Sequence, residues 1–347
     1  MDPILLVGHL LLLALGANVV AASEPDLYTR HLVRAGLSLL AAFLASRIPI
    51  KKLVDVSLYL YVGGLLLLLA TLVYGVDQNT NSLRWLNIGG FSIQPSEFIK
   101  LFLILYLARF LSKNGPDHLI SGPAVMAGAA AVLVVMQPDL DTAAFILLLT
   151  TLILVIAGVP IRRLFGIGVA ALLTVMATQG FFIKRLSYVT RRLEAFLKKE
   201  QVDQTASAQE AIARGLPFGR GPGDPVRGVP LAHNDMAYAA LTHSLGVIGS
   251  LILFSAYTLI LGRGLQIAAR TSGAVSITAL GVTLMIALEA ALHIAVVTGL
   301  LPVFGLPLPL VSYGGSSMLT FGLAIGLLHS AAREMRREEE EDLVEAA

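Results

Sequence analysis

The sequence has no cysteine among its 347 residues. Disulfide bonds, thiol catalysis and cysteine-ligated zinc are therefore excluded. Charged side chains are also scarce, since Asp, Glu, Lys and Arg make up 14% of the residues, against roughly 25% in an average soluble domain. The few charges nearly cancel, at a formal net charge of +2, so the composition gives no sign of a strongly basic surface for nucleic acid.

Apolar residues are abundant instead, at 56% of the chain, with a mean hydropathy of +0.78. Apolar runs of about 20 residues recur, which is the length that crosses about 30 Å of hydrocarbon. The runs lack the period-two alternation of membrane β-barrels. We therefore predict an all-α, polytopic integral membrane protein with about ten transmembrane helices and one long extracytoplasmic loop. The expected spans are residues 3–22, 31–46, 53–74, 96–112, 119–136, 140–158, 162–183, 237–261, 274–299 and 311–332.

The spans are expected to form one transmembrane domain over residues 1–332, followed by a charged tail at 333–347. Residues 184–234 form the long loop between the seventh and eighth spans. Lys and Arg concentrate in the short loops on the side of the N-terminus, which predicts that both termini are cytoplasmic and the long loop is outside. The first apolar run is interpreted as a retained span, because no basic residue precedes it and no soluble domain follows it.

The long loop is basic and has two different halves. The first, Arg191–Glu200, has helical spacing and predicts a helix on the membrane surface. The second, Gly215–Pro225, is rich in glycine and proline and predicts an irregular turn. A basic outer loop either holds an anionic partner such as a phosphate or is simply solvated, and the sequence leaves both interpretations open.

Asp235 is the strongest lead to chemistry. It lies in Leu231-Ala-His-Asn-Asp-Met-Ala-Tyr-Ala-Ala240, where the polar loop meets the eighth span. Acids are rare in this chain, and ionisable groups at a membrane span usually mark function or a buried pair. A carboxylate at the mouth of a span is also suitably placed to act as a general base.

Two pairs of charged or polar residues share helical faces inside spans. Glu97 and Lys100 are three residues apart in Gln94-Pro-Ser-Glu-Phe-Ile-Lys100, at the outer end of the fourth span. They form either a structural ion pair or the polar floor of an outward-facing site. Glu289 and His293, four residues apart in the ninth span, are interpreted as a satisfied interhelical polar pair, since two ligands are too few for a metal.

Further polar groups lie at the outer ends of spans. Asp139 and Asp141 flank a short turn, where each is either a helix cap or a site group. Arg84 and Trp85 precede the fourth span, where tryptophan suits either the membrane interface or contact with a sugar or pyrophosphate. The last outer loop ends in Gly-Gly-Ser-Ser at residues 314–317, a helix start that favours either anion binding or tight helix packing.

Five segments, in order along nearly the whole chain, resemble the SEDS family (shape, elongation, division and sporulation), which contains the bacterial RodA and FtsW proteins. Any one segment alone is weak evidence for the family. The five together, each at the outer end of a span, are highly specific for it. The segments are Arg84-Trp-Leu86, Gln94–Lys100, Gln137-Pro-Asp-Leu140, His233-Asn-Asp235, and Gly299-Leu-Leu-Pro302 with Pro307-Leu-Pro309 and Ser312-Tyr-Gly-Gly-Ser-Ser317.

The resemblance implies a peptidoglycan glycosyltransferase that polymerises lipid II, a disaccharide-pentapeptide on undecaprenyl pyrophosphate. It also implies a class B penicillin-binding protein as partner, and help from a divalent cation, Mg²⁺ or Mn²⁺, for which the sequence has no dedicated ligand set. No organic cofactor is expected. The family's essential acid matches Asp235, and this residue is the expected catalytic group. The expected substrate-binding residues are Arg84, Trp85, Glu97, Lys100, Ser312, Ser316 and Ser317.

Three differences from the family pattern lie around the outer loops. The family has His-Thr-Asp-Phe where this chain has His233-Asn-Asp-Met236, and Glu-Glu-Leu-Gly where it has His243-Ser-Leu-Gly246. It has glycine where this chain has Asp141. These differences leave open the fine geometry of the outer loop and the choice between a RodA-like role in elongation and an FtsW-like role in division.

In this interpretation Asp235 takes the proton of the acceptor hydroxyl. A cation such as Arg84, Lys100, Arg220 or Arg227 neutralises the leaving pyrophosphate. Two alternatives belong to other classes: a transporter that flips lipid II, and a scaffold that only recruits the penicillin-binding protein. Most polar groups lie at the outer ends of spans, which favours chemistry on one side of the membrane over alternating access.

Overall fold

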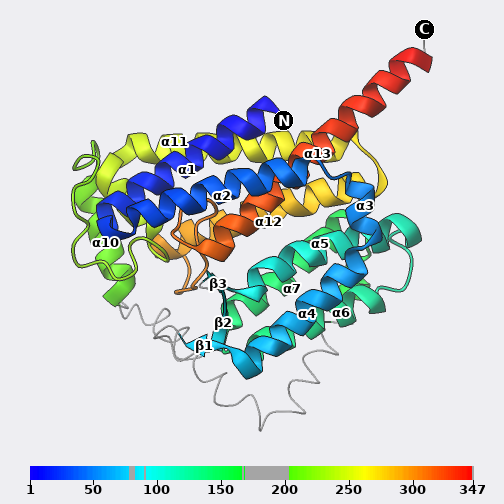
Figure 1. Ribbon diagram of the computed structural model, residues 1–347, viewed down its shortest axis with the longest axis horizontal. Coiled ribbons are helices and arrows are strands. Elements are labelled where there is room, and N and C mark those ends of the chain that lie inside the picture. The colour runs from blue at the N-terminus through cyan, green and yellow to red at the C-terminus, as the bar shows by residue number, and fades with distance from the viewer. Residues whose placement is uncertain (78–82, 90, 166–167, 169–202, 346–347) are drawn as a thin grey trace.

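The computed structural model describes residues 1–77, 83–89, 91–165, 168 and 203–345, and these residues are almost entirely helical (Figure 1). The predicted all-α fold is confirmed. A 3-10 turn, η1 (Pro25–Leu27), joins the first two helices. The helices are α1 (Pro3–Ser23), α2 (Tyr28–Ser46), α3 (Ile50–Asp55), α4 (Ser57–Tyr74), α5 (Pro95–Asn114), α6 (Ser121–Met136), α7 (Leu140–Ile156), α10 (Asp203–Gly215), α11 (Ala237–Arg270), α12 (Gly273–Val297) and α13 (Gly315–Glu345).

Five of the described helices are long and apolar enough to cross a membrane: α1, α4, α11, α12 and the first 27 residues of α13. The 21 residues of α1 span about 31 Å, close to the thickness of the hydrocarbon core. The apolar helices α6 and α7 are shorter. The chain is therefore a multi-pass membrane protein. The seventh expected span, 162–183, lies mostly outside the described residues, so the number of ten spans stays a prediction.

Three elements differ in extent from the expected spans. The third span is two helices, because α3 and α4 are separated at Val56. Helix α11 continues to Arg270, and α13 continues to Glu345 through the segment expected as a charged tail. The end of α13 projects from the bundle (Figure 1). The expected surface helix Arg191–Glu200 lies outside the described residues.

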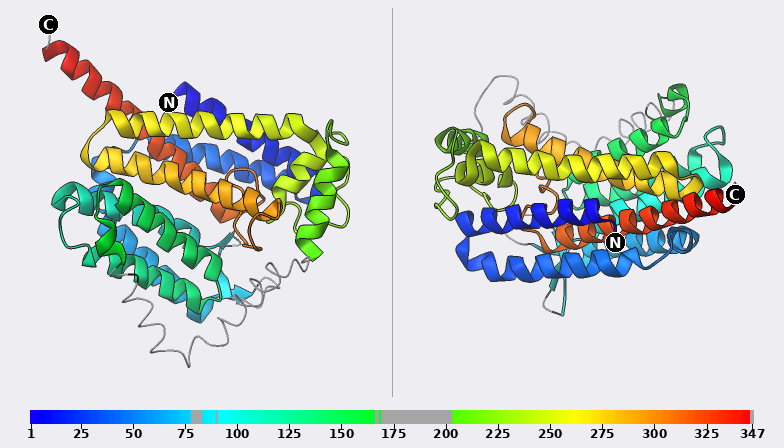
Figure 2. Two further views of the ribbon diagram at one scale, coloured as in Figure 1. Left: turned by 180° about the vertical axis from the view of Figure 1, so that it is seen from behind. Right: turned by 90° about the horizontal axis from the view of Figure 1, so that it is seen from above.

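Helices α5 and α12 form the centre of the bundle. Helix α12 packs against α5, α7, α11 and α13, and α5 packs against α4 on its other side. Helix α1 lies along α11, and α2 lies along α13 (Figures 1 and 2). Because α5 and α12 are surrounded by other helices, polar side chains on them have protein partners instead of lipid.

Helices α2 and α13 approach closely because glycines face the contact. A Cβ atom on Gly322 would lie 2.5 Å from the backbone oxygen of Ser38, and one on Gly326 would lie 2.6 Å from that of Ala42. Small residues of this kind let membrane helices pack backbone to backbone. The two helices are therefore held side by side, backbone against backbone, between Ser38 and Ala42 of α2.

Asp2 fixes one end of the bundle. Its carboxylate caps α1 by accepting from the backbone nitrogen of Ile4, and it lies 2.9 Å from Nη2 of Arg263 on α11 and 3.3 Å from Nη1 of Arg336 on α13. Burial opposes ionisation, but the hydrogen bonds and charge of Arg263, with help from Arg336, hold the pKa of Asp2 below its usual value. Three helices are thus joined at this end.

The opposite end, here called the Asp235 end, is where α2, α5, α7, α11 and α13 begin. A three-stranded antiparallel sheet lies there between α4 and α5, in the order β1 (Val76–Asp77), β2 (Leu83–Ile88), β3 (Phe91–Ile93). The hairpin between β2 and β3 pairs Leu86 with Ile93. The sheet leads the chain directly into α5 and places β2 at the same end as Asp235.

The loop after α10 packs against the first turns of α11. Gly246 interrupts α11 with a φ of +60°, and a Cβ atom there would lie 2.3 Å from the backbone oxygen of Pro217. The backbone nitrogen of Val247 donates to that oxygen at 2.9 Å, and the nitrogen of Arg220 donates to the oxygen of His243 at 2.9 Å. The glycine-rich loop is therefore bound to the helix that begins beside Asp235.

Candidate active site

Asp235 lies half-buried just before α11, in a segment tied to the start of α13. The hydroxyl of Ser312 donates to the backbone oxygen of Asn234 at 2.7 Å, and the backbone nitrogen of Tyr313 donates to the oxygen of His233 at 2.8 Å. Ser312, expected to bind substrate, is only 2% exposed and instead holds this junction. The structure thus joins two of the sequence-predicted segments, the one that contains Asp235 and the one that begins at Ser312.

His233 supports the same junction. Its ring meets the ring of Tyr313 edge-on, with centroids 5.7 Å apart. Burial lowers the pKa of His233, and the nearby Glu24 carboxylate opposes this only in part. The imidazole is therefore neutral at neutral pH and adds no positive charge beside the carboxylate of Asp235.

A second carboxylate approaches Asp235 across Gly305. Oδ2 of Asp141 accepts a hydrogen bond from the backbone nitrogen of Gly305 at 2.9 Å. The position of a Cβ atom on Gly305 is 3.7 Å from Oδ2 of Asp141 and 3.8 Å from Oδ2 of Asp235. Helices α7 and α11 and the segment between α12 and α13 therefore meet at one point, and Asp141 belongs to the site.

Asp139, the other acid of the same turn, is a helix cap. Its carboxylate accepts from the backbone nitrogen of Thr142 at 3.2 Å and lies 3.7 Å from Nη1 of Arg84. Burial raises the pKa of Asp139, against the attraction of Arg84. The same guanidinium donates to the backbone oxygens of Pro138 and Gln137. Arg84 therefore fastens β2 to the α6–α7 turn.

The remaining expected substrate-binding residues of the outer loops lie on three joined elements. Trp85 is half-buried on β2, opposite Val76 of β1. The hydroxyl of Ser316 accepts from the backbone nitrogen of Gln94 at 2.8 Å, which links the first turn of α13 to the start of α5. Ser317 follows in the same turn and is 7% exposed. The sheet, α5 and α13 thus form one wall of the Asp235 end.

Lys100 is completely buried between two carboxylates. Its Nζ atom lies 3.0 Å from Oε1 of Glu97 and 2.9 Å from Oε2 of Glu289. The aromatic rings of Phe145 and Phe321 lie above it, with centroids 5.2 and 5.7 Å away. A triad joining α5 to α12 in this way is a structural support under the Asp235 end, and the ammonium is not open to a phosphate.

Glu289 and His293 share a face of α12 as expected, but they have different partners. Glu289 pairs with Lys100 on α5. Nδ1 of His293 bonds to the backbone oxygen of Leu306 at 2.8 Å, and its Nε2 accepts from the backbone nitrogen of Tyr238 at 3.4 Å. His293 therefore holds the α12–α13 segment against the first turn of α11.

Arg34 is a cation at the Asp235 end that sequence reasoning missed. Its guanidinium carbon lies 4.0 Å from the ring centroid of Tyr313, and its Nε atom lies 3.4 Å from the Cβ position of Gly315 at the start of α13. Among the described residues it makes no ion pair with an acid. The signal was an arginine in an apolar span, which is costly and usually functional.

The described residues contain no group of three or more acidic or histidine side chains that could hold a metal ion. Asp141 and Asp235 are two carboxylates, and one of them already accepts from a backbone amide. Hard cations need six or more oxygen ligands, so this pair is not a complete resident site.

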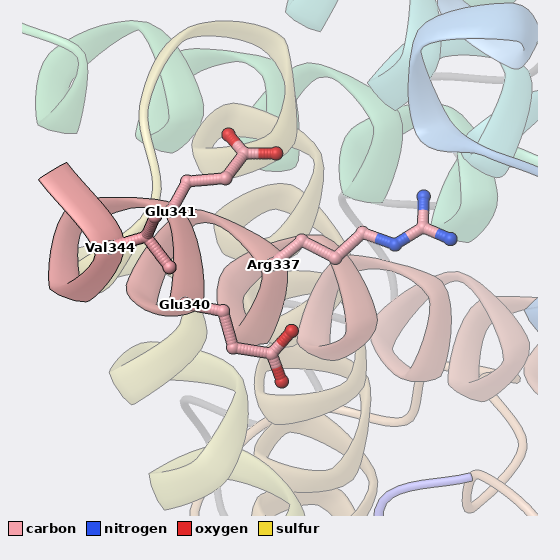
Figure 3. A pocket seen from close by; sticks show the side chains of 4 residues that line it. All are labelled: Arg337, Glu340, Glu341 and Val344. Carbon is pink, nitrogen blue, oxygen red and sulfur yellow. The ribbon is translucent and has the colours of Figure 1, made fainter.

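An open hollow at the far end of α13 is unrelated to this site. It is lined by Arg337, Glu340, Glu341 and Val344, all from one helix (Figure 3). It begins about 33 Å along the helix axis from Gly315. The hollow is therefore a groove beside the projecting end of α13 and brings together no elements of the Asp235 end.

The fold and the position of the polar groups define a multi-pass helical membrane protein whose candidate active site lies at one end of the bundle. Residues 5–337 match the family described as "Cell cycle protein", which groups FtsW, RodA and SpoVE. The chain belongs to this family, and the expected SEDS membership is confirmed.

Its relatives include proteins named "Probable peptidoglycan glycosyltransferase FtsW". The protein from Coxiella burnetii is 34% identical, and the match covers 96% of each chain. The protein from Allochromatium vinosum is 31% identical over 90% of this chain and 82% of its own length. These names support the expected glycosyltransferase activity.

Solved structures show the same fold. A chain from a peptidoglycan synthase complex that coordinates polymerization and crosslinking has a TM-score of 0.80 and 28% identity, covering 96% of this chain and 98% of that one. The Rod shape determining protein RodA of Thermus thermophilus has a TM-score of 0.71 and 26% identity, covering 96% and 97%.

Proposed function

We propose that this peptidoglycan glycosyltransferase polymerises lipid II into glycan strands at the outer face of the bacterial cytoplasmic membrane, in cell elongation or division, with Asp235 as general base. The observation that carries the proposal is the meeting of α7, α11 and the α12–α13 segment around the Asp235 carboxylate. Both termini lie in the cytoplasm in this proposal, since the Asp2 end then faces inward.

The reaction is a direct displacement. Asp235 takes the proton of the acceptor sugar hydroxyl, and the hydroxyl oxygen forms a bond to the anomeric carbon of the donor. The bond between that carbon and the pyrophosphate oxygen breaks, and undecaprenyl pyrophosphate leaves with the electron pair. A single displacement of this kind inverts the anomeric centre.

The developing charge on the pyrophosphate needs a cation. Lys100 is enclosed by two carboxylates, and Arg84 is engaged by the α6–α7 turn. Arg34 lies beside the first turn of α13, where backbone N–H groups have no partner within the helix. Arg34 is therefore better placed than Lys100 or Arg84 to meet a lipid-linked pyrophosphate.

The proposed partner is a class B penicillin-binding protein with one membrane span. It would pack on the apolar outer face of α11, where Ile248 and Leu251 are each 60% exposed. Its outer domain would touch the 184–234 loop, whose described part is bound to α11 near Gly246. Binding would favour one conformation of this loop and so adjust Asp235.

The test is polymerisation of purified lipid II by purified protein, with and without the partner. Asp235→Asn keeps the size and hydrogen bonding of the side chain but removes its basicity, and we expect turnover to fall about 10²–10⁴-fold. Asp26→Asn, which removes the same charge from the exposed 3-10 turn at this end, is the matched control.

Near-normal turnover by Asp235→Asn would reject the general base. Loss of polymerisation by the wild type itself, with partner binding retained, would favour the scaffold. Movement of lipid II across a vesicle membrane without strand formation would favour the flippase. Thermal melting of each variant checks that a lost rate does not reflect a lost fold.

A further inference from the structure

Asp141 holds the outward side of the α12–α13 segment near Asp235 through a hydrogen bond to the backbone of Gly305. Hydrogen bonds to side chains of α11 and α12 hold the inward side of this segment. His293 bonds to the backbone of Leu306 at 2.8 Å, and the hydroxyl of Tyr257 donates to the oxygen of Pro309 at 2.7 Å. Gly305 itself is exposed, and its backbone nitrogen donates to Oδ2 of Asp141.

We propose that Asp141 is a positioning residue for the glycosyl transfer, which holds Gly305 beside the carboxylate of Asp235. The proposal rests on the proposed function, because it assigns Asp141 an effect through the general base. Since Asp141 lies in the first turn of α7, it links the helix to a segment more than 160 residues further along the chain.

The physical argument concerns the space beside the base. The Cβ position of Gly305 is within 3.8 Å of a carboxylate oxygen of both Asp141 and Asp235. A backbone segment this close to the base forms one wall of the space that the acceptor hydroxyl must enter. Catalysis depends steeply on such geometry, and a displacement of about 1 Å can cost roughly 100-fold in rate. Without the hydrogen bond to Asp141, the segment would shift, and the acceptor hydroxyl would be less well aligned with Asp235.

Three variants separate the hydrogen bond from the charge. Asp141→Asn keeps an oxygen that accepts from Gly305, so we expect kcat for lipid II polymerisation within about two-fold of the wild type. Asp141→Ala removes the acceptor, and we expect kcat to fall roughly ten-fold with KM changed less than two-fold, since alignment and not ground-state binding is lost. Asp26→Asn again controls for the loss of one negative charge from this end.

A double variant tests whether Asp141 acts through Asp235. In the Asp235→Asn background, Asp141→Ala should leave the residual rate unchanged within about two-fold, because residues that act as a unit are not additive. A full further ten-fold loss in this background would overturn the positioning role. So would wild-type kcat in Asp141→Ala, an equal loss in Asn and Ala, or a rise in KM alone.

The two proposals fail in different measurements. The general base fails if Asp235→Asn polymerises at a normal rate, whatever Asp141 does. The positioning role fails if Asp235→Asn loses turnover as expected while Asp141→Ala keeps the kcat of the wild type. Circular dichroism and thermal melting of Asp141→Ala in detergent distinguish a misaligned site from an unfolded α7.

Discussion

At the scale of single residues, the buried charges at the centre of the bundle have partners on different helices. Glu97 and Lys100 follow from helical spacing, and the structure joins them. The third member of the triad, Glu289, is 189 residues from Lys100, and no local pattern connects the two. His293 is close to Glu289 in sequence yet bonds to the α12–α13 segment. Tertiary packing decides which of the possible partners a buried charge meets.

Asp139 and Asp141 illustrate the same limit two residues apart. Spacing leaves each of them as a helix cap or a site group. The structure separates them, because Asp139 caps α7 and pairs with Arg84, whereas Asp141 reaches Gly305 beside Asp235. The direction of a side chain around the first helical turn depends on where the neighbouring segments lie, which sequence alone does not give.

The buried triad leads to a prediction about stability. Lys100→Met should remove the cation between Glu97 and Glu289 and leave two buried carboxylates without a counter-charge. Breaking a buried pair in this way costs about 3–5 kcal/mol. Glu289→Gln leaves Glu97 paired with the ammonium of Lys100, so it should lower the free energy of unfolding by less. Thermal melting in detergent measures the order of the two variants.

Specific activity is the second measurement on these variants. Because Lys100 has no exposed surface, polymerisation per folded molecule of Lys100→Met should stay near that of the wild type. A normal melting temperature with lost turnover would mean that Lys100 contacts substrate, as its inclusion among the substrate-binding residues predicted. The structural role would then be wrong.

At the scale of elements, long apolar helices are the part of the fold that sequence predicts well. The first, eighth and ninth spans begin within a residue of their predicted starts. The three-stranded sheet is not among the elements expected from the sequence, because its strands are short. Its signal was present in Gly89, which has a φ of +58° in the two-residue hairpin connection that favours glycine.

The glycine-rich loop offers a test with an internal control. Gly219 and Gly223 have similar φ angles of +80° and +83°, so alanine adds a comparable backbone strain at both, about 1–2 kcal/mol. A Cβ atom on Gly219 would also lie 2.3 Å from the backbone oxygen of Ser244, whereas Gly223 faces open space. Gly219→Ala should therefore lower the melting temperature clearly more than Gly223→Ala.

The same pair of variants bears on activation. If the loop conformation adjusts Asp235, Gly219→Ala should change the ratio of activities with and without the penicillin-binding protein, and Gly223→Ala should change it less. An unchanged ratio in both variants, with intact basal activity, would show that this loop does not transmit the effect of the partner.

At the scale of the whole molecule, the two ends of the bundle have different tasks. The Asp2 end joins α1, α11 and α13 through arginines, and the Asp235 end gathers the candidate chemistry. The excess of Lys and Arg in the loops predicts that the Asp2 end is cytoplasmic. The orientation stays a prediction, because a bundle of helices has the same contacts in either direction.

Topology can be tested in this cysteine-free chain. Arg227 and Lys113 are both exposed, Arg227 in the loop before Asp235 and Lys113 in the last turn of α5. Arg227→Cys should react with an impermeant thiol reagent on intact spheroplasts, and Lys113→Cys only after lysis. The reverse labelling would mean that the orientation in the membrane is inverted and that the candidate active site faces the cytoplasm.

Helix α13 has a mechanical consequence. It begins at Gly315 among the residues around Arg34 and Gln94, and it runs without interruption to Glu345, beyond the rest of the bundle (Figure 1). A continuous helix transmits a twist or a pull along its whole length. A protein that binds the projecting end of α13 is therefore connected by one continuous helix to the candidate active site at the other end of the bundle.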